Sequence, residues 1–232
     1  MTVLLRSIPP NFAGKYPNVK IVKGDYDSFD VLAEAASLAD IVVRMYPSVH
    51  ARIRIAANYH IDNGDSDHEP SINAIIAGLR RRSAPSFLLH LSGTAIVSDF
   101  NSPTYLGKLN PKIWSDIEDI GTIASLPDTA IHRNTEKILN ATTAEHGDKI
   151  KIAIMCPPDI YGRGKGPGKT WSALVPIFIN EVKKLDGRVF YYGEGTNTRS
   201  WVHIDDVMTV YLNVIEAAAS GGGNAQWGKD VN

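Results

Sequence analysis

The chain has 232 residues, of which 44% are hydrophobic and 21% charged, a composition typical of a soluble globular protein with a real core. Its formal net charge of −1 gives no electrostatic reason to expect binding to nucleic acid or to an anionic membrane. The single cysteine, Cys156, excludes an internal disulfide and a multi-cysteine zinc site, and it is typical of a reducing compartment. The start of the chain lacks a signal-peptide pattern and no apolar run could span a membrane, so we expect a cytoplasmic protein without a metal centre.

Apolar, β-branched runs bounded by turn residues alternate along the chain with segments of helical periodicity. Strands are predicted, in chain order, over 2–7, 19–25, 40–44, 87–93, 149–156 and 188–193. Helices are predicted over 28–39, 71–82, 132–147, 171–185 and 204–219. Strands that alternate with helices indicate parallel β-α-β units and therefore an α/β fold. The segment 45–70 interrupts this alternation with a long stretch of poor pattern.

The helix ends carry their own signals. Asp27 or Ser28 is expected to cap the first predicted helix, and Gly147 is expected to stop the third. DSDHE (65–69) fits no zinc or calcium ligand pattern, and it predicts the polar start of a helix with Pro70 near its first position.

The glycine-rich stretch YGRGKGPGKTW (161–171) invites comparison with a phosphate-binding loop. A Walker-type loop needs G-x-x-x-x-G-K-[ST], in which backbone amides wrap the phosphates. Gly168, Lys169 and Thr170 supply the end of this pattern, but Arg163 stands where the first glycine is required. A surface loop with flexible glycines is therefore favoured over an ATP or GTP site.

Five motifs follow one order along the chain: LLRS, VKIVKGDYDSFDVLAEAASLADIVV, FLLHLSGTAIV, KIAIMCPPDIYGRGKGPG and RSWVHIDDVMTVYLNVIEAA. This order resembles the extended short-chain dehydrogenase/reductase family, in particular its NAD-dependent epimerase/dehydratase-like branch. CPPDIYGRG is similar to the RPxxVYGxG element of that family. The resemblance implies a Rossmann-like, doubly wound, mostly parallel sheet with a small C-terminal substrate lobe.

The resemblance also implies a division into two parts. Residues 1–156 would form the NAD(P)-binding domain, without the first β-α unit of the family and with an atypical insertion over 45–65. Residues 157–232 would form the substrate lobe and a returning helix, incomplete at the C-terminus.

A cofactor site at the carboxyl ends of the strands is implied by the same resemblance. Arg6 and Ser7 would lie beside the adenosine ribose, where a bidentate arginine favours NADP over NAD. The alternative for Arg6 is an exposed loop arginine. Asp25 would contact the adenine amino group or, alternatively, cap the following helix. Pro157 completes the implied cofactor-binding residues.

The implied reaction site contains hydroxyl groups and charged side chains. Thr94, with Ser92 beside it, matches the hydroxyl that the family places against the reacting oxygen of the substrate. A Ser-Gly-Thr turn can also close strands for structural reasons alone. Tyr161 and Arg199 are the implied substrate-binding residues, Arg199 by pairing with a phosphate or carboxylate. His203, with Asp205 or Asp206, is expected to cap the last helix.

Three departures from the family pattern bear on activity. The glycine-rich cofactor loop G-x-x-G-x-x-G is absent from the sequence. The catalytic Tyr-x-x-x-Lys pair is also absent: its positions match Asp128 and His132, of which only His132 could carry a proton near neutral pH. Cys156 stands where the family motif has arginine, and we expect it to be a buried apolar filler.

The irregular segment has a genetic explanation that can be tested. Arg44-Met45-Tyr46 stands where the family pattern stops, and a 5′ splice signal GTATGT reads in frame across these three residues. We hypothesise that residues 45 to about 62 are a translated retained intron or a gene-model error, which transcript sequencing would decide.

The leading hypothesis is a NAD(P)-binding epimerase/dehydratase-like oxidoreductase that acts on a carbonyl or hydroxyl of a small molecule or nucleotide sugar. A small-molecule substrate is the expected partner, nucleic acid and membrane are not, and a homodimer is left open. One alternative is a catalytically inactive NAD(P)-sensing regulator, as in the NmrA-like relatives of the family. Another is a non-functional fragment produced by an incorrect gene prediction.

Overall fold

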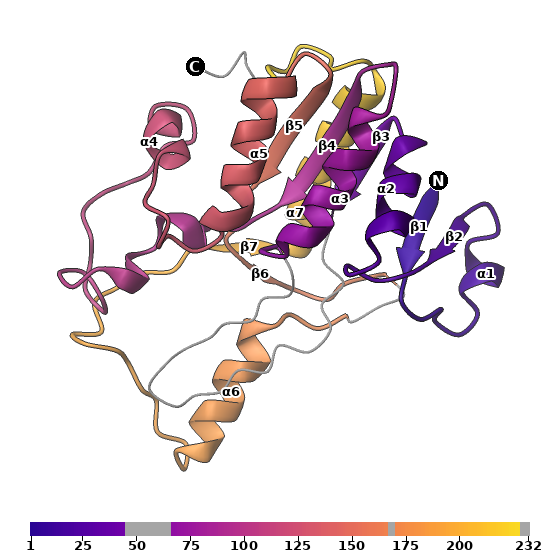
Figure 1. Ribbon diagram of the computed structural model, residues 1–232. Helices are drawn as coiled ribbons and strands as arrows, with labels where there is room; N and C mark the ends of the chain where they lie inside the picture. The colour runs from indigo at the N-terminus through magenta and orange to yellow at the C-terminus, as the bar shows by residue number, and fades with distance from the viewer. Residues whose placement is uncertain (45–65, 167–169, 228–232) are drawn as a thin grey trace.

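The computed structural model describes residues 1–44, 66–166 and 170–227 (Figure 1). The strands that it contains pair in parallel throughout. β1 (Thr2–Leu5) pairs with β2 (Lys20–Lys23), β4 (Ser86–Leu91) lies between β3 (Ile41–Arg44) and β5 (Ile150–Met155), and β6 (Asp159–Tyr161) pairs with β7 (Trp201–His203). The predicted α/β fold with parallel strands is confirmed.

The helices are α1 (Phe12–Lys15), α2 (Phe29–Ser37), α3 (Glu69–Arg80), α4 (Ile120–Ala124), α5 (Arg133–His146), α6 (Leu174–Lys184) and α7 (Ile204–Ala219), with 3-10 turns η1 (Thr94–Val97) and η2 (Asp99–Asn101). Five of them fall within the predicted helical segments or within two residues of them. Among the described residues, no helix is both long enough and apolar enough to cross a bilayer.

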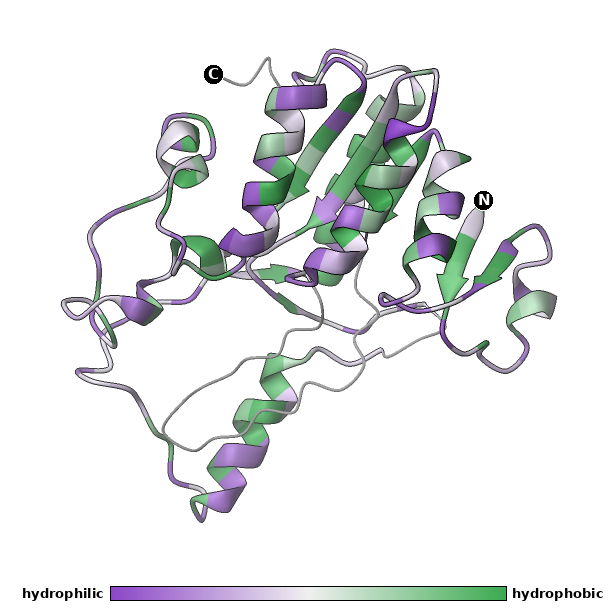
Figure 2. Ribbon diagram, in the orientation of Figure 1, coloured by the Kyte–Doolittle hydropathy of each residue, from purple (hydrophilic) through white to green (hydrophobic). Residues whose placement is uncertain are grey.

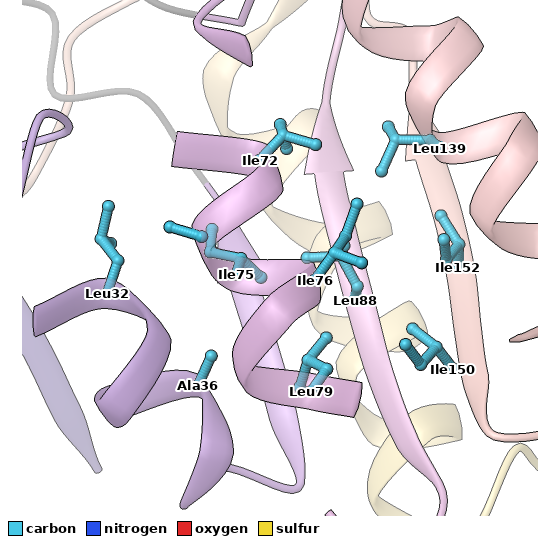
Figure 3. Close-up of a cluster of buried hydrophobic side chains, with 11 residues drawn as sticks. Leu32, Ala36, Ile72, Ile75, Ile76, Leu79, Leu88, Leu139, Ile150 and Ile152 are labelled. Carbon is cyan, nitrogen blue, oxygen red and sulfur yellow. The ribbon is translucent and has the colours of Figure 1, made fainter. Parts of the chain in front are cut away.

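The central strands are covered on both faces, as a doubly wound fold requires. Leu88 of β4 faces α3 and α5, and it packs with Leu139 and Ile150 in a core that also includes α2 (Figure 3). Phe87 of β4 faces the opposite side, where it packs against Trp227 and the helix α7. Figure 2 shows hydrophobic residues concentrated on β4 and β5 between these helices. Successive side chains of β4 point to opposite faces of the sheet, and both faces of this strand carry apolar residues.

The helix-end predictions hold with small changes. Ser28 occupies the N-cap position of α2, but its side chain makes no capping bond there. Gly147 is the C-cap of α5, as predicted. His68 caps α3 by accepting a hydrogen bond from the Ser71 amide at 3.2 Å, and Pro70 lies in the first turn of α3.

The strand predicted over 188–193 is wrong. Val189 and Tyr191 are 74% and 76% exposed, and the segment pairs with no described strand. It lies instead beside the loop that precedes residue 110, where Lys108 pairs with Glu194 at 3.0 Å. A pattern of β-branched and aromatic residues produces a strand only where a sheet edge is available to pair with it.

Two predictions concern residues that the structure does not describe. The proposed insertion over 45–65, with its suspected intron, lies outside the described residues. So do residues 167–169 of the glycine-rich stretch, which include the Gly168-Lys169 part of the Walker-like pattern.

Candidate active site

The carboxyl ends of β4 and β5 carry the first group of predicted site residues. Leu91 pairs with Met155 at the end of the two strands. Beyond that pair, the Ser92 amide donates to the Met155 carbonyl at 2.8 Å, and the Thr94 amide donates to the Pro157 carbonyl at 3.2 Å. The structure thus brings Ser92, Thr94 and Pro157 to one edge of the sheet.

Ser92 is bound to a buried acid that sequence reasoning missed. Its hydroxyl donates a hydrogen bond to Oε1 of Glu136 in α5, and Glu136 is only 3% exposed. Burial raises the pKa of the Glu136 carboxyl, while the hydrogen bond from Ser92 acts in the opposite direction. The spacing of Glu136 in the sequence could have indicated this burial. Glu136 lies three residues before the core residue Leu139, so the two side chains share one face of the helix.

His132 lies on the other side of the same turn. It immediately precedes α5 with a positive φ of 67°, a conformation that costs free energy for a residue other than glycine. Its ring is buried, and a Cβ atom added to Gly93 would stand 3.1 Å from Nε2 of His132. The lack of a side chain at Gly93 therefore allows the imidazole to approach the Ser92–Thr94 turn.

The opposite edge of the His132 ring contacts a carboxylate that was not predicted. Nδ1 lies 2.7 Å from Oδ1 of Asp67 and 3.1 Å from the Ser66 hydroxyl. Burial by itself would raise the pKa of Asp67, but the hydrogen bonds that its carboxylate accepts from His132 and Ser66 outweigh burial and lower that pKa. Asn134 fixes the position of Asp67, since its amide donates to the Asp67 carbonyl at 2.8 Å.

A second buried histidine lies beneath this group. Nδ1 of His90 in β4 is 3.1 Å from Nη1 of Arg44, and Arg44 also donates to the Ser66 carbonyl and the Ser71 hydroxyl, each at 3.0 Å. Burial and the adjacent guanidinium lower the pKa of His90 to about 3, so its ring is neutral at physiological pH. These contacts hold Ser66, and with it Asp67, beside the ends of β3 and β4.

Thr94 and Asp128, unlike these buried groups, are exposed to solvent. Thr94 is exposed, and its hydroxyl forms no hydrogen bond to any residue that the structure describes. Asp128, at the position that matches the family tyrosine, is solvent-exposed and pairs with Lys137 at 2.7 Å. That ion pair lowers the pKa of the Asp128 carboxyl and keeps the group charged.

The residues predicted to bind the cofactor lie at the ends of β1 and β2. Arg6 and Ser7 follow β1 and are exposed. Asp25 follows β2, where it accepts hydrogen bonds from the Ser28 hydroxyl at 2.8 Å and the Asp27 amide at 3.2 Å. It therefore shapes the turn before α2, and the alternative in which Asp25 itself caps that helix is wrong.

The predicted substrate-binding residues lie on the short β6–β7 pair. Arg199 forms an ion pair with Asp159, in which Nη2 and Nε lie 2.6 Å and 2.7 Å from Oδ2 of the carboxylate. Tyr161 packs edge-on against the ring of His203, with centroids 5.2 Å apart. His203 accepts from the Asp205 amide at 3.2 Å and so caps α7, as predicted. Within the described residues, no hydrogen bond joins Arg199 or Tyr161 to the Ser92–His132 group.

The expectation for Cys156 requires correction. It is exposed as a residue because it lies just past the end of β5, although its sulfur points inward to 3.9 Å from Oε1 of Glu136. Burial of the thiol and the nearby carboxylate raise its pKa to about 12. Cys156 is thus a protonated thiol at the edge of the site rather than a core filler.

A hollow of about 180 Å³ lies beside the 3-10 turns η1 and η2. Its walls come from η1 and η2, from the segment 126–131 that leads to His132, and from Trp114. Asp99 and Asn101 add polar groups to this wall, so the hollow combines apolar and polar surface.

A family model matches part of the chain. Residues 130–228 match the NAD dependent epimerase/dehydratase family. An oxidase, ucsJ, from Acremonium sp is 28% identical over 210 residues, which are 89% of this chain and 55% of that protein. A dTDP-glucose 4,6-dehydratase from Mycolicibacterium smegmatis is 25% identical over 196 residues, which are 81% of this chain and 51% of that protein. The chain thus spans about half the length of these curated relatives.

Solved structures agree with the fold. A dTDP-glucose 4,6-dehydratase from Streptomyces venezuelae, determined with NAD bound, superposes with a TM-score of 0.57 at 18% identity, over 92% of this chain and 62% of that one. A UDP-glucose 4-epimerase from Thermotoga maritima superposes with a TM-score of 0.52 at 16% identity, over 93% of this chain and 65% of that one. The predicted Rossmann-like fold and the predicted family resemblance are both confirmed.

Proposed function

We propose, from the match of residues 130–228 to the NAD dependent epimerase/dehydratase family, that this protein is a NAD(P)-dependent oxidoreductase. Its substrate is a small molecule or nucleotide sugar with a carbonyl or hydroxyl at the reacting carbon. The observation that carries the proposal is the gathering of Ser92, Thr94 and His132 at the carboxyl ends of parallel strands, where α/β sheets bind their ligands. We assign the nucleotide to residues 1–156 and the substrate lobe to residues 157–232.

In this proposal, Arg6 and Ser7 would receive the adenosine end of the dinucleotide, and the Ser92–Thr94 turn would receive the nicotinamide end. Arg6 and Ser7 stand exposed after β1, so their side chains are accessible to a ribose and its phosphate. At the other end, the turn at Gly93 and the Pro157 backbone leave an open edge beside the exposed Thr94. When bound, a nicotinamide nucleotide would supply hydride acceptor or donor chemistry there.

The two hydroxyls are suited to different tasks. The Ser92 hydroxyl already donates its hydrogen bond to Glu136. The exposed Thr94 hydroxyl is available to donate to a substrate oxygen. Thr94 would therefore orient and polarise that oxygen, and Ser92 would hold the turn in place. His132 would take up or return the proton of the same oxygen, since imidazole exchanges protons near neutral pH.

Nucleotide binding and turnover can be measured separately. Quenching of tryptophan fluorescence by NADPH and NADH reports binding, and absorbance at the nicotinamide band during incubation with carbonyls and nucleotide sugars reports turnover. Arg6→Ala is expected to weaken NADPH binding by about tenfold or more and to leave NADH binding within about twofold, because the guanidinium pairs with a 2′-phosphate. Arg81→Ala, which removes another exposed arginine, is the matched control. If neither NADPH nor NADH binds, the proposal is contradicted.

A second candidate is a regulator that senses the nucleotide without turning over a substrate. The observation that favours it is Asp128: a charged carboxylate paired with Lys137 stands where the family has its proton-transferring tyrosine. Binding of NADPH or NADH without oxidation or reduction of any compound in the panel would support the regulator over the enzyme.

A further inference from the structure

We propose that Asp67 and His132 form a positioned acid/base pair that takes the place of the tyrosine–lysine pair absent from this chain. The inference rests on the proposed function for the identity of the reaction. His132 is the group that would exchange a proton with the substrate, and Asp67 is a positioning residue that acts through His132.

The contact between the two side chains fixes which nitrogen of His132 carries hydrogen. Oδ1 of Asp67 lies 2.7 Å from Nδ1, and an ionised carboxylate can only accept a hydrogen bond. Nδ1 must therefore be the protonated nitrogen, which leaves Nε2 of the neutral ring with a free lone pair. A carboxylate that orients an imidazole in this way is the arrangement by which a histidine becomes an effective general base.

The free nitrogen faces the predicted reaction site. Gly93 approaches Nε2 so closely that a Cβ atom would be 3.1 Å away, so this edge of the ring borders the Ser92–Thr94 turn. No residue in the described part of the chain forms a hydrogen bond with Nε2. A substrate hydroxyl held by Thr94 could give its proton to Nε2 as the O–H bond breaks, and the reverse reaction would return that proton to the oxygen.

The surroundings hold the pair in one geometry. Asn134 donates to the backbone of Asp67 at 2.8 Å and to Glu69 at 3.1 Å, which ties the start of α3 to the start of α5. The Ser66 hydroxyl lies 3.1 Å from Nδ1 of His132 and 3.2 Å from Oδ1 of Asp67, and so bridges the two groups. The left-handed backbone of His132 is strained, and such strain persists where neighbouring contacts impose it.

Other charged or titratable side chains lie near the Asp67–His132 pair. Glu136 and Arg133 lie on α5 itself, while His90 of β4 and Arg44 of β3 act from the sheet. A test of Asp67 must therefore compare variants that leave these four groups unchanged.

Nuclear magnetic resonance of protein labelled with 15N in histidine gives a readout that needs no bound nucleotide. The variant His132→Gln assigns the His132 signals among the seven histidines of the chain. In the wild-type protein, we expect the neutral His132 ring to carry its hydrogen on Nδ1. In Asp67→Asn, we expect that tautomer to lose its dominance. Asp27→Asn is the matched control, because it makes the same change in a separate pair, His68–Asp27 at 3.1 Å.

Steady-state kinetics then tests the catalytic role. His132→Gln should lower kcat by about 10²-fold or more, the usual contribution of proton transfer, with KM within about twofold. Asp67→Asn should lower kcat at least tenfold and change the pH dependence of kcat, whereas Asp27→Asn should change neither. Wild-type hydrogen on Nε2, or an unchanged tautomer in Asp67→Asn, would overturn the inference. Failure of nucleotide binding would overturn the proposed function and leave the tautomer result standing.

Discussion

His90 and Glu136 are ionisable side chains enclosed beneath the candidate active site. One is a base whose pKa is lowered and the other an acid whose pKa is raised, and burial is the leading cause in both. Both shifts favour the neutral form of the side chain. The two shifts have opposite consequences for stability, because they are displaced from the unfolded chain in opposite directions.

Acid should destabilise the protein through His90. Its pKa is about 3 in the folded protein, against an ordinary value of 6.5 for the unfolded chain, so the stability it contributes is present above pH 6.5 and is lost as the pH falls toward 3. Between pH 7 and pH 5, the wild-type protein should lose about 2 kcal/mol more unfolding free energy than His90→Gln, which can still accept from Arg44. Urea denaturation at the two pH values measures this difference, and an equal loss in both proteins would contradict the enclosed position of His90.

Glu136 should produce the opposite trend. Because its pKa is raised when folded, its contribution to stability is present below the unfolded value of 4.5 and is lost as the pH rises through the folded value. The stability of the wild-type protein relative to Glu136→Gln should therefore fall from pH 4 to pH 8. Glutamine retains an oxygen that accepts from Ser92, so the comparison isolates the charge. Parallel pH profiles of the two proteins would show that Glu136 is not desolvated.

At the scale of secondary-structure elements, α2 and α3 pack in close contact in the core. A Cβ atom on Gly78 of α3 would stand 2.2 Å from the Ala33 carbonyl oxygen and 2.8 Å from the Ala36 Cβ. The two helices can pack this closely only because residue 78 has no side chain. Their contact in turn places Ile75 and Leu79 in the core against the sheet (Figure 3).

Gly78→Ala should therefore separate α2 from α3. We expect a loss of about 1–3 kcal/mol in unfolding free energy, the usual cost of inserting a methyl group into a packed contact. Gly121→Ala in α4 is the control, because a Cβ atom added there would meet no atom within 4 Å beyond its chain neighbours and the backbone of its own helix. That variant should be neutral or stabilising by up to about 1 kcal/mol, since alanine favours a helix over glycine. Thermal or urea denaturation of both variants distinguishes the two outcomes.

Across the molecule as a whole, burial is unevenly distributed. β4 is buried along nearly its full length between helices on both faces, whereas α6 has no buried residue. Figure 1 shows α6 standing away from the layered core. Phe178 of α6 and Phe190 make a ring contact with centroids 5.4 Å apart, yet both remain partly exposed. Regions with few buried apolar contacts open at low free energy.

Hydrogen exchange should reveal this difference. Backbone amides of α6 are expected to exchange through local opening, well before the amides of β4 and β5, which should exchange only with global unfolding. Mass spectrometry of peptides from 174–184 and from 86–91, taken over a time series, measures both. Equal protection of the two peptides would mean that α6 is as tightly packed as the sheet.

Much of the fold could be predicted because its signals are local. Alternating apolar runs and helical periodicity placed β1 to β5 and five helices, since each pattern is set by residues within one turn or a few strand positions. The β6–β7 pair escaped detection because three residues in each strand are too few to show a period. The segment 188–193 had the right residues for a strand, but its structure depends on whether a sheet edge lies within reach.

The candidate site divides in the same way. Ser92, Thr94 and His132 could be named because they belong to motifs beside strand and helix ends, and residue order alone brings the ends of parallel strands to one edge. Asp67 meets His132 across 65 residues of chain, and Glu136 meets Ser92 across 44. No local pattern encodes such pairs, since side chains far apart in sequence meet only once helices have packed on the sheet. The amino-acid order by itself therefore determined the helices and strands and the sheet edge at which polar groups lie. Only tertiary packing decided that Glu136 binds the Ser92 hydroxyl and that Asp67 binds the His132 imidazole.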